Sequence, residues 1–329
     1  MIGGALEAQG LQVLVWHVHG SWLTSFVQGA HTYLIPATPE GGPWARGRSG
    51  RDWPDSAREI APGDLATAAV DLVVLQRPEE IELAESWLGR QLGHGVPAVY
   101  VEHNTPRGDV PDTRHPLAGR SDIPVVHVTH FNALMWDSGL APTVVIPHGV
   151  IDPGERYTGE LKRAAVVINE PVRRWRVTGT DLLPAFAQVA SLDLFGMGLD
   201  GVHDRTGVDA DRLRAVGDLD RNSLATAMGR RRLYLHTARW TSLGLSLIEA
   251  MHLGMPVVAV DNTAAHSAVP PEAGVVSADL AKLSMAVHEL LEEPEAAGRM
   301  GKAARQFALV NYSLDAFVCR WQALFDLVV

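Results

Sequence analysis

Short runs of Val, Ile and Leu alternate along this chain with longer segments whose apolar residues recur every three or four positions. The first pattern is typical of strands buried on both faces of a parallel sheet, and the second of helices that cover such a sheet. A break at Ile146–Val150, followed by Asp152-Pro-Gly154, separates two such series. We therefore expect an α/β protein with two Rossmann-like, doubly wound domains.

In the first series, six apolar runs predict strands and two amphipathic segments predict helices. The predicted strands are Val13–Val18, Thr32–Ile35, Val70–Gln76, Val96–Glu102, Val125–Thr129 and Val144–Ile146, and the predicted helices are Glu79–Leu92 and Phe131–Ser138. Residues 37–64 are rich in Gly, Pro, Arg and Trp and lack periodicity. We expect a long surface loop there, and loops of that length are often functional.

The second series continues the alternation. Its predicted strands are Ala165–Ile168, Leu192–Phe195, Leu233–His236 and Val257–Val260, and its predicted helices are Thr180–Ala190, 208–215, 222–229, Leu243–Leu253, Leu280–Leu291, Ala296–Val310 and Leu314–Leu327. We expect one domain over residues 1–150 and a second over 151–310. Residues 311–329 form a terminal helix that can pack back on the first domain.

Composition restricts the partners and the compartment. The net charge of −10 argues against nucleic acid, whose phosphates are bound by clusters of Lys and Arg. Residues 1–150 contain nine arginines and sixteen acidic residues, so strong association with anionic membranes is not expected. Residues 1–10 contain Glu7 and no basic residue, unlike a secretory signal. Together with the single cysteine, Cys319, this indicates a cytoplasmic location.

The segment Trp240–Ala259 carries the most chemistry. Thr241 and Ser242 can cap a helix that begins near Leu243, whose first backbone N–H groups can then receive a phosphate. Glu249 lies about two turns further on, where a carboxylate can accept hydrogen bonds from paired ribose hydroxyls. A capped core helix with a solvated glutamate fits these residues equally well.

The same segment resembles the nucleotide-sugar signature of the retaining glycosyltransferase family GT4 (glycosyl transferases group 1), in which Glu-x7-Glu is followed by Ala-Met and Gly-x-Pro-Val-Val. Further resemblances occur in the family's order, at Tyr100–His103, Val128–Leu134, Val145–Val150, Gly179–Leu183 and Met300–Trp321. The resemblance implies a GT-B fold, two Rossmann-like domains facing a central cleft. It also implies retaining transfer of a sugar from a nucleoside diphosphate to an acceptor hydroxyl, assisted by the diphosphate, without a metal or other cofactor.

Two positions depart from the family pattern. Thr241 stands where the first glutamate is expected, and Thr178 replaces the lysine before Gly179. The positive charge that faces the donor diphosphate must then come from arginines in the loop after the first strand of the second domain, and guanidinium groups suit phosphate oxygens. These arginines are Arg173, Arg174 and Arg176. Each arginine taken alone is more often simply solvated.

The resemblance also implies roles for individual residues. His103, Arg173 and Arg176 are the expected catalytic residues, with His103 supporting the donor sugar or its phosphate. The expected nucleotide-sugar-binding residues are Glu249, Arg174, Gly196, Thr241, Ser242, Leu243, Gly244 and Leu245. The first strand-to-helix turn is expected on the acceptor and donor-sugar side, with His19, Gly20, Ser21 and Trp22. A core role for Trp22 and a structural role for His103 remain alternatives.

Two other functions fit the same sequence. A sugar-nucleotide epimerase shares the architecture, and a non-catalytic sugar-nucleotide-binding protein would explain the missing glutamate at Thr241. His127, His130 and His148 are scattered without the spacing of a zinc helix, so no metal site is expected. The expected partners are a nucleotide sugar and a small-molecule or glycan acceptor. The oligomeric state is left open.

Overall fold

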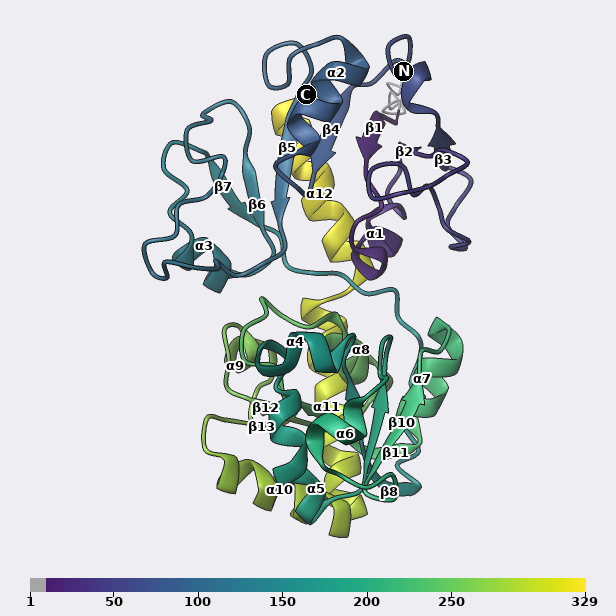
Figure 1. Cartoon of the computed structure of the whole chain (residues 1–329), viewed down its shortest axis with the longest axis vertical. Helices are drawn as coiled ribbons and strands as arrows, with labels where there is room; N and C mark the ends of the chain where they lie inside the picture. The colour runs from purple at the N-terminus through teal and green to yellow at the C-terminus, as the bar shows by residue number, and fades with distance from the viewer. Residues whose placement is uncertain (1–9) are drawn as a thin grey trace, which may run out of the picture. The chain divides into compact units, whose positions relative to one another are not determined.

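The computed structural model describes residues 10–329, which form two compact units (Figure 1). The first unit comprises the described residues up to Gly149 together with Asp315–Val329, and the second is Val150–Leu314. The division lies one residue before the predicted boundary, and the terminal helix belongs to the first unit from Asp315 onward. Residues 1–9, which hold most of the segment used to argue against a secretory signal, lie outside the described residues.

The first unit is built on a parallel seven-stranded sheet of order β3-β2-β1-β4-β5-β6-β7. The strands are β1 (Gln12–Val15), β2 (Thr32–Pro36), β3 (Ala57–Ile60), β4 (Leu72–Leu75), β5 (Ala98–Glu102), β6 (Val125–His127) and β7 (Thr143–Val145). The chain moves outward in one direction from β1 to β3 and in the other from β4 to β7. The strand order therefore reverses between β1 and β4, which makes this the topological switch point of the sheet.

The helices of the first unit are short except for the terminal one. They are α1 (Gly20–Phe26), η1 (Pro62–Asp64), α2 (Glu80–Leu88), α3 (His130–Met135) and α12 (Leu314–Val328). The predicted helix 79–92 is too long, because Gly89 adopts a left-handed conformation with φ 63° and ends α2. The expectation that residues 37–64 form only a loop is wrong at its end, where Ala57–Ile60 is an edge strand paired with β2.

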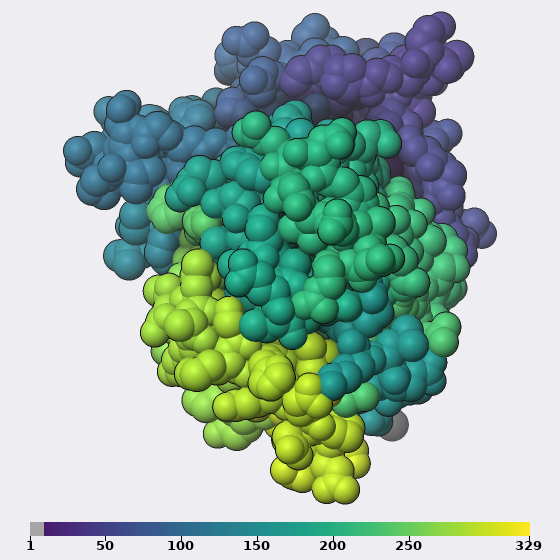
Figure 2. Space-filling view, turned by 60° about the horizontal axis from the view of Figure 1, so that its bottom comes forward, coloured from purple at the N-terminus to yellow at the C-terminus, as the bar shows by residue number. Residues whose placement is uncertain are grey.

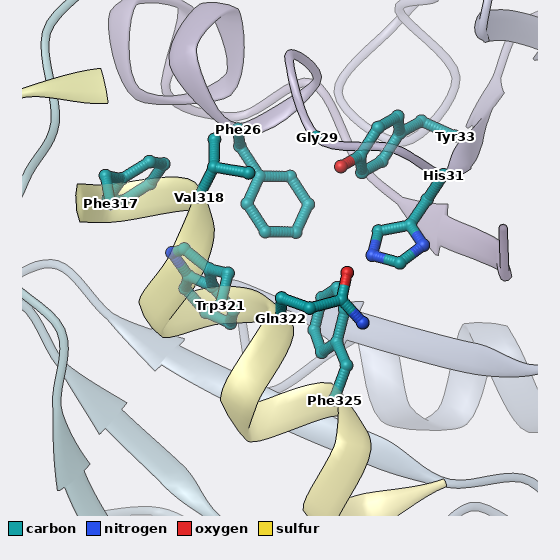
Figure 3. Close-up of a pocket in the computed structure, with 9 residues that line it drawn as sticks. All are labelled: Phe26, Gly29, His31, Tyr33, Phe317, Val318, Trp321, Gln322 and Phe325. Carbon is teal, nitrogen blue, oxygen red and sulfur yellow. The ribbon is translucent and has the colours of Figure 1, made fainter. Parts of the chain in front are cut away.

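The terminal helix α12 completes the aromatic core of the first unit. The ring of Phe26 in α1 lies 5.0 Å from that of Trp321 and 6.1 Å from that of Phe325, measured between centroids. Figure 3 shows these side chains with Tyr33 and His31 of the β2 region around a small pocket. Phe26, Trp321 and Phe325 are each at most 3% exposed. Burial of large aromatic rings at this contact ties the end of the chain to α1 and β2.

The second unit repeats the architecture with a parallel six-stranded sheet of order β10-β9-β8-β11-β12-β13. The strands are β8 (Leu161–Val167), β9 (Leu192–Phe195), β10 (Leu213–Gly217), β11 (Arg231–His236), β12 (Val257–Val260) and β13 (Gly274–Ser277). The switch point lies between β8 and β11. The predicted helix over 208–215 is wrong, because Leu213–Gly217 pairs with β9 as the edge strand of the sheet.

Nine helical segments of the described chain belong to the second unit. They are α4 (Pro171–Thr178), η2 (Thr180–Leu182), α5 (Leu183–Val189), α6 (Val202–Thr206), α7 (Arg221–Gly229), α8 (Leu245–Leu253), α9 (Ala265–Ala268), α10 (Leu280–Glu292) and α11 (Pro294–Asn311). Helix α10 packs on α5 and β11, whereas α11 packs on α8. Figure 2 shows the face of this unit on which α10 and α11 form much of the surface. Within residues 10–329, every helix is too short or too polar to cross a bilayer.

Candidate functional site

The predicted site residues gather at the carboxyl edges of the two sheets, next to the switch points. In the first unit, His19 follows β1 and His103 follows β5. In the second unit, the arginines of α4 follow β8, and the segment leading into α8 follows β11. Open parallel sheets bind their ligands at this edge, because the strands on either side of a switch point send their loops in opposite directions and leave a crevice.

Helix α8 holds the residue on which the nucleotide prediction rests. It begins at Leu245 rather than Leu243, and its N-cap residue, Gly244, makes no side-chain capping bond. The predicted capping by Thr241 and Ser242 is therefore wrong, and within residues 10–329 the first N–H groups of α8 receive no side-chain cap. Glu249 lies one turn into the helix. A free helix start close to a carboxylate is a suitable arrangement for a phosphate beside a ribose.

The carboxylate of Glu249 is held in an unusual environment. The side chain is half-buried and, within the described part of the chain, has no hydrogen-bond or ion-pair partner. Burial raises the pKa of Glu249, and the charge of Arg221 on α7 partly opposes the rise. Removing a charged group from water without giving it a partner costs stability. An uncompensated carboxylate of this kind is typical of a ligand-binding position.

The chain before α8 is fixed by the residues that follow β12. Thr263 donates its hydroxyl to the carbonyl oxygens of Thr241 (2.5 Å) and Ser242 (2.8 Å), and it adopts φ 29°. Gly244 packs on His236, since a Cβ atom there would lie 2.8 Å from the Cε1 atom of the imidazole. Ser242 is buried, and in the described residues the buried Oγ1 of Thr241 has no hydrogen-bond partner. Packing, rather than capping, thus sets where α8 begins.

The three predicted arginines lie on α4, not in a loop, which corrects the prediction of their setting. Arg173 is paired with Glu170, and Arg176 lies 3.1 Å from Asp181, measured from Nη1 to Oδ2. The side chains of Arg173 and Arg176 are each 72% exposed, and Arg174 is half-buried. Exposed ion pairs contribute at most about 1 kcal/mol. A phosphate can therefore replace these carboxylates at little cost.

Arg239 is a basic residue of this region that the sequence analysis missed. It lies directly before the Trp240–Ala259 segment and binds both carboxylate oxygens of Asp181, at 2.5 and 3.0 Å. Arg176 shares the same carboxylate. The contact depends on Gly179, which has φ 69° and whose added Cβ would lie 1.8 Å from the carbonyl oxygen of Thr237. Two guanidinium groups and one carboxylate leave a net positive charge beside the switch point.

Gly196 allows the loops after β8 and β9 to approach each other. Its φ is 130°, and an added Cβ atom would lie 2.3 Å from the carbonyl oxygen of Ile168. The side chain of Asn169 accepts a hydrogen bond from the backbone N–H of Met197 at 3.0 Å. Only glycine fits this approach without displacing the backbone. The predicted glycine turn thus lies at the same edge as the arginines of α4.

Three histidines come together in the first unit. The ring of His103 lies 4.2 Å from that of His19 and 6.4 Å from that of His148, measured between centroids. Gln76 donates to the carbonyl oxygen of Trp16 at 2.8 Å, which turns its amide oxygen toward His103 Nε2 at 3.1 Å. Burial lowers the pKa of His19 and of His148 to about 4 and lowers that of His103 strongly. At neutral pH these imidazoles are uncharged hydrogen-bonding groups.

The turn after β1 differs from its prediction in one residue. Helix α1 begins at Gly20, and Ser21 is exposed. Trp22 is only 2% exposed; its ring stacks on Phe26 at 4.6 Å and meets the edge of Trp321 at 5.9 Å. A flat face for a sugar ring is not available there, because the indole is already packed on both sides. The core alternative for Trp22 is correct.

A metal centre is not formed by the described residues. Within residues 10–329, no three His, Cys, Asp or Glu side chains are arranged to hold a metal ion. The expected independence from metals stays a prediction.

The second unit contains the part of the chain that resembles a known family. Residues 210–307, from before β10 into α11, match the family model for glycosyl transferases group 1. A sequence search of curated proteins found no match. The matched range contains α8 and Glu249.

Solved structures resemble the chain over nearly its whole length. Sucrose-phosphate synthase from Thermosynechococcus elongatus has a TM-score of 0.73 at 15% identity, covering 96% of this chain and 98% of that protein. Anabaena HepE in complex with UDP and glucose has a TM-score of 0.71 at 14% identity, covering 97% and 99%. A glycosyltransferase from Rickettsia africae has a TM-score of 0.67 at 13% identity, covering 97% and 98%. At such identities the likeness establishes the fold.

Proposed function

We propose that the chain is a glycosyltransferase of group 1 that moves a sugar from a nucleoside diphosphate to an acceptor hydroxyl with retention of anomeric configuration. The GT-B fold supports this proposal. The observation that carries this proposal is the pairing of Glu249 with an uncapped helix start in the second unit. The carboxylate would accept hydrogen bonds from the ribose hydroxyls of the donor. The first N–H groups of α8 would contact its phosphates.

The basic residues of α4 suit the departing diphosphate. As the bond from the anomeric carbon to the diphosphate oxygen breaks, negative charge develops on that oxygen. Arg173 and Arg176, with Arg174 nearby, would stabilise this charge without a metal. The acceptor oxygen bonds to the anomeric carbon on the same face, and its proton passes to the departing diphosphate. This route requires no nucleophile from the protein.

The histidine cluster of the first unit contributes polar groups rather than charge. His103 is uncharged at neutral pH, and Gln76 orients its ring. We infer that it hydrogen-bonds the donor sugar or its phosphate, with His19 beside it. Because both imidazoles remain neutral well below pH 7, they can donate or accept without altering the charge balance of the reaction.

Incubation of candidate nucleotide sugars with and without acceptors tests the proposal. We expect the donor to be consumed only when an acceptor is present, with product formation followed by mass spectrometry. The coupling constant of the anomeric proton in the product then reports retention or inversion. Conversion of the donor alone to another sugar would identify an epimerase. Donor binding without turnover over a broad acceptor panel would identify a binding protein.

The raised pKa of Glu249 predicts a stability change for the ligand-free protein. A carboxyl whose pKa is raised by folding destabilises the fold above that pKa, and the effect disappears as pH falls through it. Glu249→Gln is therefore expected to raise Tm at pH 7, by about 2–4 °C for each kcal/mol regained. The gain should vanish at acidic pH. Thermal unfolding at several pH values measures it, with Glu272→Gln at an exposed position as the control; a lower Tm at pH 7 would contradict the assignment.

A further inference from the structure

The loop between β2 and β3 is a built structure although its sequence has no periodicity. The guanidinium group of Arg48 donates to three carbonyl oxygens within and just after the loop, and its backbone N–H donates to Glu59 at 2.6 Å. Trp53 donates its indole N–H to the hydroxyl of Thr24 in α1 at 2.8 Å. The loop is thus held together internally and anchored on α1. Side chains that it presents at the carboxyl edge of β1 have a defined place.

One of these side chains is Arg51, which lies over the start of α1. A Cβ atom added to Gly20 would be 2.8 Å from Nη2 of Arg51 and 3.3 Å from Nε2 of His17. His17 donates from Nδ1 to the carbonyl oxygen of Gly47 at 2.8 Å, so its Nε2 is the unprotonated nitrogen of the neutral ring. A guanidinium group and an acceptor nitrogen therefore face the same point beside Gly20.

A second arginine of the same loop, Arg46, also acts on His17. Burial is the main cause that lowers the pKa of His17, and the hydrogen bond to Gly47 opposes it. The charges of Arg46 and Arg51 lower this pKa further. Both arginines are exposed. Among the residues that the structure describes, neither side chain has an ion-pair or hydrogen-bond partner, in contrast to Arg77, which is paired with Glu80 at 2.7 Å. Two positive charges of this loop thus have no counterion among the described residues.

We propose that Arg46 and Arg51 bind a phosphate monoester on the acceptor, so that the natural acceptor is a phosphorylated small molecule. This inference rests on the proposed transferase function. Two guanidinium groups match the charge of a phosphate dianion, and each can hold two of its oxygens. In the proposed function, the donor diphosphate is bound by other residues, those of α4 and α8 in the second unit. Nε2 of His17 can accept a hydrogen bond from an acceptor hydroxyl.

The binding site is tested first without any turnover. Inorganic phosphate is titrated into the full chain, and tryptophan fluorescence is recorded, because Trp53 lies in the same loop with its ring 4.8 Å from that of His17. We expect Arg51→Gln to weaken phosphate binding at least tenfold and Arg46→Gln to weaken it several-fold. Arg58→Gln, at an exposed arginine of β3, should leave it unchanged. Equal phosphate affinity in all variants, or no binding by the parent protein, overturns the proposal.

Transfer measurements then show whether Arg51 acts on the acceptor or on the donor. With a productive donor, hexose monophosphates are compared with the matching unphosphorylated hexoses and uronic acids. We expect transfer to the phosphorylated acceptors, and a tenfold or greater rise of the acceptor KM in Arg51→Gln with an unchanged donor KM. A rise of the donor KM alone, or a preference for uronic acids, overturns the proposal. Phosphate binding that depends on Arg51 without transfer to any acceptor would instead count against the transferase function.

Discussion

Replacing Glu249 by alanine is expected to weaken binding of the nucleoside diphosphate about 100-fold or more and to reduce transfer accordingly. The carboxylate would accept two hydrogen bonds from the ribose, and hydrogen bonds to a charged group contribute about 1.5–3 kcal/mol each. A loss of about 2.7 kcal/mol corresponds to a factor of 100 in affinity. Isothermal titration calorimetry with the diphosphate of the productive donor measures the change.

Loss of the Glu249 carboxylate should not disturb folding, because within the described chain it has no hydrogen-bond or ion-pair partner. The stability of the variant therefore serves as a control for the binding measurement. Because the change also removes the cost of the buried charge, Tm of the Glu249→Ala protein should not fall below that of the parent at pH 7. Glu272→Ala, at an exposed position of the same unit, should bind the nucleotide as the parent does. Unchanged affinity in Glu249→Ala would show that the ribose is bound elsewhere, and the proposed donor site would have to be abandoned.

Asp193→Ala is expected to destabilise the second unit by about 3–5 kcal/mol. The carboxylate, on β9, is fully buried and lies 2.6 Å from Arg163, 2.5 Å from Arg214 and 2.6 Å from Arg231. Its removal leaves Arg231, whose side chain is only 6% exposed, as a buried charge without a counterion. Chemical denaturation followed by circular dichroism measures the loss; two transitions are to be fitted separately, since the chain has two units.

The matched variant is Arg214→Gln, because the Arg214 side chain is 52% exposed and its pair with Asp193 is screened by water. This change should cost about 1 kcal/mol or less. Burial raises the pKa of Asp193, but the three arginines outweigh that effect and the pKa is lowered overall. The contribution of this cluster is therefore present above the unfolded pKa and is lost as pH falls through the lowered value. If the denaturation midpoint of Asp193→Ala equals that of the parent protein, the buried ion-pair cluster does not stabilise the second unit.

Local patterns were sufficient for the buried strands and for the helix that bears Glu249. Leu192–Phe195 and Val257–Val260 form strands with the predicted bounds, and each is an uninterrupted apolar or mostly apolar run with no exposed position. Gly254 ends α8 in a left-handed conformation with φ 87°, as its place after the helical pattern indicates. Such features depend on neighbours within a few residues, so the sequence displays them directly.

Edge strands were harder to predict. In β10, Leu213 is fully buried whereas Arg214 and Ala215 are exposed, so the apolar pattern is too weak to tell a strand from a helix. Pairing with β9 makes it a strand. The same holds for β3, where Ala57 is the buried residue and the strand is hidden in a segment without periodicity. At both edges, backbone hydrogen bonds to the neighbouring strand determine the strand conformation, and the side-chain pattern does not show these bonds.

By itself, the sequence determined the doubly wound class and the division into two units, because buried runs and glycine turns are short-range features. Only the tertiary structure decided that Trp22 belongs to the core, that α8 starts uncapped, and that Arg51 lies over Gly20. These facts arise from side chains far apart in the chain that compete for the same space. Apolar periodicity records which face of an element is buried, but not which distant loop covers it.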